Sequence, residues 1–105
     1  MRHHCTAAVW AAFALIYVSS AFAEPVVLSI RAPEARAISI YGSFDGWGVG
    51  HPLARDTGGL WKATVDLPKG ATEYKFLIDG EWRINPIISS IADGFEGRNN
   101  ILIVR

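Results

Sequence analysis

The chain has 105 residues, of which 50% are hydrophobic and 19% are charged, and its ten basic and ten acidic residues give a formal net charge of zero at pH 7. A neutral chain of this length has no room for two large domains and no basic surface of the kind that binds nucleic acid. Cys5 is the only cysteine and histidine is scarce, which leaves almost no ligands for a zinc or copper site, so neither a metal nor a cofactor is predicted.

Residues 1–23 are predicted to be a secretory signal peptide. A basic start precedes an apolar run over residues 5–22, and the run ends in the small-x-small sequence Ala21-Phe22-Ala23. The apolar run is at the short edge of the roughly 17–25 residues that a membrane-spanning helix needs, which favours cleavage after Ala23 over a retained anchor. We therefore expect an exported protein, periplasmic or secreted, that has no membrane association after cleavage and consists of one domain over residues 24–105.

Short segments that alternate apolar and polar residues, separated by glycine and proline, follow the leader, and this pattern is typical of β-strands. No stretch has a convincing helical period. The predicted strands cover residues 26–31, 36–42, 60–67, 72–79, 81–84 and 101–104. Several short antiparallel strands with turn signals between them predict an all-β fold, an immunoglobulin-like antiparallel β-sandwich.

Alternation along two of these strands predicts which side faces the core. In residues 60–67 one face carries apolar side chains and the other carries polar ones, and the same holds in residues 72–79. The predicted core residues are Trp61, Ala63, Val65 and Leu67 in the first strand and Tyr74, Phe76 and Ile78 in the second. Trp61 is therefore assigned to the core and left out of any surface site.

The dipeptide Asp79-Gly80 predicts a two-residue type I′ hairpin, because both positions tolerate a positive φ. In the resulting register Ile78 pairs with Glu81, Leu77 with Trp82, and Lys75 with Ile84. Trp82 and Lys75 then point outward together, on the face opposite Tyr74 and Phe76. An outward tryptophan beside an ammonium group gains nothing from folding unless a ligand or partner covers it, so this pair indicates a binding surface.

Two tryptophan-bearing segments define that surface further: YGSFDGW at residues 41–47 and YKFLIDGEW at residues 74–82. A late Asn99-Asn100 pair follows them. The broad, electron-rich face of tryptophan packs well against the C–H face of a pyranose ring, while amide and ammonium groups bond the ring hydroxyls. These residue types together predict a carbohydrate-binding site.

The domain from about Ala35 to Arg105 resembles the family 48 carbohydrate-binding modules, in particular the glycogen-binding domain of the AMP-activated protein kinase β subunit. The order and spacing of several short motifs carry the resemblance. They are GSFDGW at 42–47, GLW at 59–61, LPKG at 67–70, YKF at 74–76, DGEW at 79–82, NP at 85–86 and NN at 99–100. The resemblance implies an immunoglobulin-like β-sandwich that binds α-1,4-linked glucans such as glycogen, starch and maltodextrins and is not catalytic.

The resemblance also implies roles for individual residues. Trp47 and Trp82 would stack on glucose rings, and Lys75 and Asn99 would bond glucose hydroxyls. Of the two late asparagines, Asn100 is expected to have a structural role instead, satisfying backbone groups where the last strand begins.

Two positions on the last loop depart from the family pattern. Phe95 stands where the family usually has a leucine that reaches into the curve of the glucan, and an aromatic ring there can serve the same purpose. Gly97 stands where a threonine often donates a hydrogen bond, so we expect that contact to be missing.

Each residue assigned to the site also has a structural interpretation that the sequence leaves open. In that interpretation Trp47 caps the sandwich, Trp82 packs on its own hairpin, and Lys75 is an ordinary surface lysine. Asn99 then bonds backbone groups and Phe95 closes the core. Trp82 would then pack over Leu77, and Lys75 would form an ion pair with Glu73 or Asp79.

The predicted function is that of a non-catalytic carbohydrate-binding module whose partner is an α-glucan polysaccharide or oligosaccharide. An exported protein-interaction or structural module that uses the same aromatic face stays open as the alternative. So does recruitment of a separate glycan-active enzyme or kinase-type subunit. An enzyme is disfavoured, because Asp79 and Glu81 flank an exposed turn and no histidine or cysteine stands beside a nucleophile.

Overall fold

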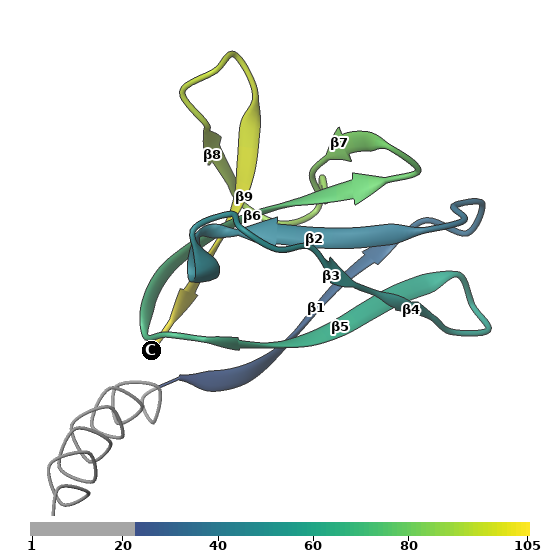
Figure 1. Ribbon diagram of the computed structural model, residues 1–105, viewed down its shortest axis with the longest axis horizontal. Coiled ribbons are helices and arrows are strands. Elements are labelled where there is room, and N and C mark those ends of the chain that lie inside the picture. The colour runs from purple at the N-terminus through teal and green to yellow at the C-terminus, as the bar shows by residue number, and fades with distance from the viewer. Residues whose placement is uncertain (1–22) are drawn as a thin grey trace, which may run out of the picture.

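Residues 23–105, the part of the chain that the computed structural model describes, form nine strands in two antiparallel sheets (Figure 1). The three-stranded sheet has the order β1-β5-β4, with β1 (Glu24–Arg31), β5 (Leu60–Leu67) and β4 (Ala54–Arg55). The six-stranded sheet has the order β3-β2-β6-β9-β8, with β3 (His51–Pro52), β2 (Ile38–Gly42), β6 (Gly70–Ile78), β9 (Arg98–Val104) and β8 (Ser90–Ala92). Its sixth strand, β7 (Glu81–Arg83), pairs with β6. The predicted all-β sandwich is confirmed. The predicted signal peptide lies, except for Ala23, outside the described residues.

All six predicted strands are present, with their ends shifted by up to three residues. β5 covers residues 60–67 as predicted, whereas β9 begins three residues before the predicted start at 101. The sequence missed β3, β4 and β8, because strands of two or three residues are too short to show alternation. β3 and β4 belong to different sheets, and Leu53 between them is buried and donates its N–H to the carbonyl of Ile38 at 2.9 Å.

The core lies between the two sheets and is made of the predicted inward faces. In the register of β1 and β5, Ile30 lies opposite Trp61. β6 contributes Tyr74 and Phe76, whose rings pack edge-on with their centroids 5.8 Å apart. The buried apolar residues are Leu28, Ile30, Ile38, Ile40, Leu53, Trp61, Val65, Leu67, Tyr74, Phe76 and Val104. The indole N–H of Trp61 donates to the carbonyl of Ala32 at 2.9 Å. Trp61 therefore belongs to the core, as predicted.

The outer face of the six-stranded sheet carries the residues predicted to bind. Opposed residues share a face, so the pairs Tyr41–Lys75 and Leu77–Trp82 place all four side chains on that face. Tyr74 lies opposite Asn100 on the inner side, which puts Asn99 on the outer face beside Lys75. In Figure 1 the β6–β7 and β8–β9 hairpins rise on the side away from the three-stranded sheet.

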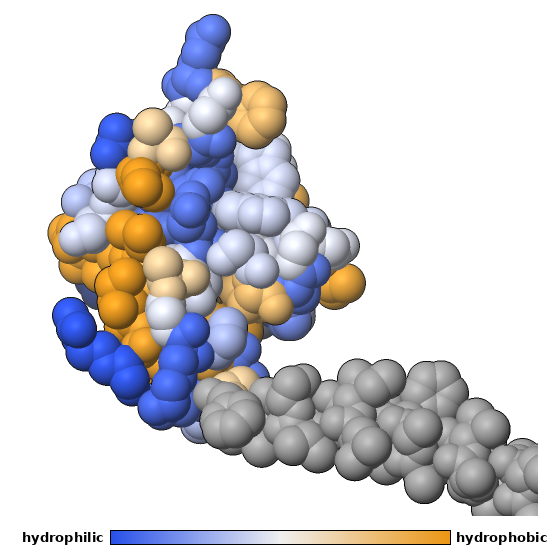
Figure 2. All heavy atoms as spheres, turned by 90° about the vertical axis from the view of Figure 1, so that its left-hand side faces the viewer, coloured by the Kyte–Doolittle hydropathy of each residue, from blue (hydrophilic) through white to orange (hydrophobic). Residues whose placement is uncertain are grey.

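Apolar residues also reach the surface. In Figure 2 they form a band on one side of the molecule, bordered by polar residues. Ile87 and Phe95 are the most exposed large apolar side chains of residues 23–105, at 85% and 88%. No helix in the same range is long and apolar enough to cross a membrane.

Candidate functional site

All five predicted site residues line two adjoining hollows on the outer face of the six-stranded sheet. Trp47, Lys75, Phe95 and Asn99 line the first, which has a volume of about 360 Å³. Lys75, Trp82 and Phe95 line the second, which has a volume of about 630 Å³. Since Lys75 and Phe95 line both hollows, the five residues form one surface, which we call the platform.

Trp47 is held by a loop that folds back on itself and is tied to β6. The loop contains a short 3₁₀ helix, η2 (Ser43–Asp45), and the hydroxyl of Ser43 accepts the backbone N–H of Glu73 at 3.0 Å. Trp47 donates its N–H to the carbonyl of Gly42 at 2.8 Å, and its residue surface is 39% exposed. The loop therefore presents the indole at the surface instead of packing it into the core.

The base of the same loop is fixed by a carboxylate. Asp45 accepts a hydrogen bond from the N–H of Gly48 at 3.3 Å and lies 3.1 Å from the Nε2 atom of His51, at the start of β3. The His51 ring also lies against Phe44, with ring centroids 5.3 Å apart. These contacts join the two ends of the loop that carries Trp47.

Trp82 follows a hairpin with the predicted geometry. Asp79 and Gly80 have φ values of 50° and 86°, as a type I′ turn requires. The predicted pairs Ile78–Glu81 and Leu77–Trp82 are present. The ladder ends at Phe76–Arg83, so the predicted Lys75–Ile84 pair lies beyond it. Trp82 is 54% exposed.

Lys75 is neither a free surface lysine nor a partner of Glu73 or Asp79. Its ammonium group lies 2.8 Å from the Oδ2 atom of Asp93, and the two side chains are only 18% and 10% exposed. The hydrogen bond from Lys75 is the main reason that the pKa of Asp93 is lowered to about 2, helped by the N–H groups of Phe95 and Gly97. Sequence reasoning missed Asp93 because the two partners are 18 residues apart and no local pattern joins them.

Phe95 extends from the turn between β8 and β9 and is almost entirely exposed. The interpretation in which it closes the core is therefore wrong. Its backbone N–H donates to the Oδ1 atom of Asp93 at 2.7 Å, as does that of Gly97 at 3.0 Å. The ring is held at the boundary of the two hollows by its backbone, while the side chain stays open to a ligand.

The two late asparagines have different roles. Asn99 is 6% exposed and donates from its side-chain amide to the carboxylate of Glu73 at 3.1 Å, at the floor of the first hollow. Asn100 is fully buried, accepts the N–H of Asn85 at 2.7 Å and donates to the carbonyls of Asn85, Ile88 and Ser89. The structural role predicted for Asn100 is confirmed.

Left-handed backbone conformations occur in the loops that carry the platform residues. Within residues 23–105, three non-glycine residues have a φ in the left-handed region: Trp47 at 64°, Asp79 at 50° and Glu96 at 70°. They lie in the three loops that carry Trp47, Trp82 and Phe95. Such conformations cost on the order of 1 kcal/mol each and persist where the surroundings impose them, often at functional sites. The sequence predicted the positive φ at Asp79 from the Asp-Gly turn but not those at Trp47 and Glu96.

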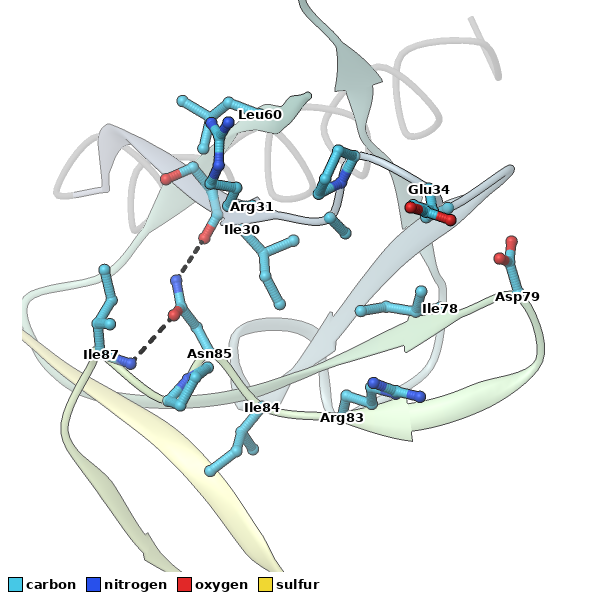
Figure 3. A pocket seen from close by; sticks show the side chains of 15 residues that line it. Ile30, Arg31, Glu34, Leu60, Ile78, Asp79, Arg83, Ile84, Asn85 and Ile87 are labelled. Atoms are coloured by element: carbon cyan, nitrogen blue, oxygen red, sulfur yellow. Dashed lines mark hydrogen bonds between the residues drawn. The ribbon is translucent and has the colours of Figure 1, made fainter. Parts of the chain in front are cut away.

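A third hollow, with a volume of about 720 Å³, is larger than either hollow of the platform and shares Arg83 and Ile84 with the second of them (Figure 3). Apolar side chains such as Ile30, Ile78 and Ile84 form much of its wall. Of its polar side chains, that of Asn85 has structural partners, since its amide donates to the carbonyl of Ser29 at 3.1 Å and accepts the N–H of Ile87 at 3.2 Å. None of the residues that line this hollow is aromatic, so it offers no ring on which a sugar could stack.

The two carboxylates of the hairpin turn have structural partners. Asp79 accepts the backbone N–H groups of Arg36 and Ala37, each at 2.9 Å, and Glu81 pairs with Arg83 at 2.9 Å. Neither lines either of the two hollows of the platform. Asp79 and Glu81 are therefore not placed as a pair of catalytic carboxylates across either hollow.

Comparison with known proteins gives a match that covers almost all of the described residues. A family model described as the glycogen recognition site of AMP-activated protein kinase matches residues 24–105. The 5'-AMP-activated protein kinase subunit beta-1 of Sus scrofa is 33% identical over 87 residues, which cover 83% of this chain and 69% of that protein.

Two plant proteins are similar over a shorter region. The chloroplastic protein PTST of Arabidopsis thaliana is 37% identical over 73 residues, 67% of this chain and 26% of that protein. The amyloplastic phosphoglucan phosphatase DSP4 of Castanea sativa is 41% identical over 73 residues, 66% of this chain and 20% of that protein. The chain therefore spans about a quarter or less of these two relatives.

Proposed function

The chain belongs to the family of glycogen recognition domains found in AMP-activated protein kinase, and from this membership we propose that it is a non-catalytic module that binds α-1,4-linked glucans on the platform. Trp47 and Trp82 stack on glucose rings in the two hollows. Lys75 and Asn99 donate hydrogen bonds to glucose hydroxyls, and Phe95 fills the curve of the glucan between the hollows. The ligand is glycogen, starch or a maltodextrin.

The observation that carries this proposal is the convergence of the five residues on one surface. They come from three parts of the chain: the loop that carries Trp47, the β6–β7 hairpin and the β8–β9 hairpin. Lys75 and Phe95 nevertheless line both hollows, with Trp47 in the first and Trp82 in the second. Exposed aromatic rings next to an ammonium and an amide group supply both the stacking surface and the donors that a sugar needs.

The expected affinity is low, because the platform is open and contacts only a few sugar units. A dissociation constant on the order of 10 μM to 1 mM corresponds to about −4 to −7 kcal/mol. A glucan chain long enough to engage several copies would be retained more strongly through avidity.

Titration of maltoheptaose and β-cyclodextrin against tryptophan fluorescence tests the proposal. A saturable change in fluorescence is expected for the wild type. The affinity should fall at least about tenfold in Trp82→Ala and in Trp47→Ala. Trp61→Phe is the matched control, because Trp61 is buried in the core and should change the baseline signal without changing the affinity. If glycogen, amylose and these oligosaccharides all fail to bind the wild-type protein, the proposed function is wrong.

Export and partners are part of the same proposal. The sequence Ala21-Phe22-Ala23 precedes β1, which begins at Glu24, so cleavage after Ala23 would leave the described strands intact. Mass spectrometry of the protein from its native source is expected to show Glu24 as the first residue, and an intact Met1 would contradict export by this route.

One relative is named as a kinase subunit and another as a phosphatase, which supports a separate enzyme as a partner.

A further inference from the structure

Asp93 lies where the two hollows meet and was not assigned to the site from the sequence. Its side chain lines both hollows and is 10% exposed. Its two carboxylate oxygens have separate partners. Oδ1 accepts the backbone N–H groups of Phe95 and Gly97, and Oδ2 accepts the ammonium group of Lys75.

The contact with Oδ2 determines where the ammonium group of Lys75 lies. A lysine side chain has a flexible four-carbon stem and loses rotamer entropy when it is held in one place, so an unpaired lysine on a sheet surface is usually mobile. Here the 2.8 Å ion pair directs the group to the junction of the hollows. An ammonium group has three donors, and Asp93 engages one, which leaves two for ligand hydroxyls.

The absence of a side chain at position 97 makes this arrangement possible. A Cβ atom at Gly97 would lie 2.6 Å from the Oδ2 atom of Asp93, the oxygen that bonds Lys75. Contacts under about 3.0 Å are essentially never seen for real Cβ atoms. Gly97 therefore leaves space that the carboxylate of Asp93 occupies.

We infer that Asp93 is a positioning residue of the platform: it holds the ammonium group of Lys75 at the junction of the hollows while it holds the turn that carries Phe95. This role presupposes the glucan binding proposed above. Loss of Oδ2 as an acceptor releases Lys75 alone, whereas loss of both oxygens also releases the turn.

The variants Asp93→Asn and Asp93→Ala separate the two tasks. Asparagine keeps a carbonyl oxygen for the N–H groups of Phe95 and Gly97 but turns an NH₂ group, which cannot accept, toward Lys75. Maltoheptaose binding should weaken about tenfold in Asp93→Asn, while the amides of Phe95 and Gly97 keep their protection from hydrogen exchange. In Asp93→Ala both the affinity and the protection should be lost.

A double-mutant cycle shows whether Asp93 acts through Lys75. Lys75→Met should weaken binding, and Asp93→Asn added to it should weaken binding no further. Glu81→Gln is the matched control, since it breaks the Glu81–Arg83 pair, whose side chains are 70% and 61% exposed, and should leave the affinity unchanged. Equal affinity of Asp93→Asn and wild type, or additive losses in the double variant, would overturn the role of Asp93.

The ¹⁵Nζ signal of Lys75 tests the same contact without a glucan. A hydrogen-bonded ammonium group exchanges its protons slowly enough to be observed, so the signal should be present in the wild type and lost in Asp93→Asn. If the wild-type protein binds no glucan, the proposed function fails. Persistence of the signal in Asp93→Asn would show instead that Asp93 does not hold Lys75.

Discussion

Tyr41 packs edge-on against Trp82, with ring centroids 5.1 Å apart and ring planes inclined at 72°. The two residues come from β2 and β7, which lie on opposite sides of β6. Tyr41 lines neither of the two hollows of the platform. It therefore supports the Trp82 ring from the side and leaves the ring accessible to a ligand.

Replacing Tyr41 should weaken glucan binding although it does not line the platform. An edge-to-face aromatic pair contributes about 0.5–1.5 kcal/mol, so Tyr41→Ala is expected to lower the affinity for maltoheptaose roughly two- to tenfold by loosening Trp82. Tyr41→Phe keeps the ring and should bind as the wild type does. Fluorescence titration of both variants measures the difference, and an unchanged affinity in Tyr41→Ala would show that Trp82 needs no support.

The two asparagines at the start of β9 should separate stability from binding. Asn100→Ala leaves the buried N–H of Asn85 and nearby carbonyls without partners, so the free energy of unfolding should fall by about 2–4 kcal/mol. Asn99→Ala is the matched control, with a smaller loss of stability but weaker glucan binding. Urea denaturation and maltoheptaose titration measure the two effects. A variant Asn100→Ala as stable as Asn99→Ala would contradict the role assigned to Asn100.

Thr72 offers a stabilising substitution. Its side chain is 1% exposed, and its hydroxyl has no hydrogen-bond partner among the described residues. Thr72→Val removes a buried polar group at similar volume and should raise the free energy of unfolding by about 1 kcal/mol, or the midpoint temperature by roughly 4–8 °C. The exposed Thr64 on β5 gives the control, since Thr64→Val should change stability by less than about 0.5 kcal/mol. Calorimetry that finds Thr72→Val less stable would mean that the hydroxyl has a partner.

The lowered pKa of Asp93 predicts a loss of stability in acid. Its folded pKa of about 2 lies below the ordinary value of 3.8, so the ionised carboxylate favours the folded state. That contribution is fully present above about pH 4 and is lost as the pH falls toward 2. The stability difference between wild type and Asp93→Asn should therefore be constant from pH 5 to 7 and shrink between pH 4 and 2. Urea denaturation across this range checks it, and a difference that does not change with pH would contradict the pairing with Lys75.

Alternation and turn chemistry predicted most of the sheet structure, because both depend on neighbours in the sequence. The hairpin at Asp79-Gly80 formed as predicted, and its register placed Trp82 and Lys75 on one outward face. The same pattern assigned Trp61 to the core. Strands β3, β4 and β8 could not be predicted, because each has only two or three residues, too few for an alternation of apolar and polar side chains to show.

Residue types and their spacing by themselves predicted the sandwich and the family resemblance, because these depend on local periodicity and on the order of short motifs. The resemblance in turn implied the roles of the five candidate residues. Only the tertiary structure decided how those residues are held. It paired Lys75 with Asp93 and placed Tyr41 beside Trp82. The side chain of Phe95 is exposed. Asn100 is buried, whereas its neighbour Asn99 lines the first hollow of the platform. The Lys75–Asp93 and Tyr41–Trp82 contacts join segments that meet only when the sheets assemble, so no local pattern in the sequence predicts them.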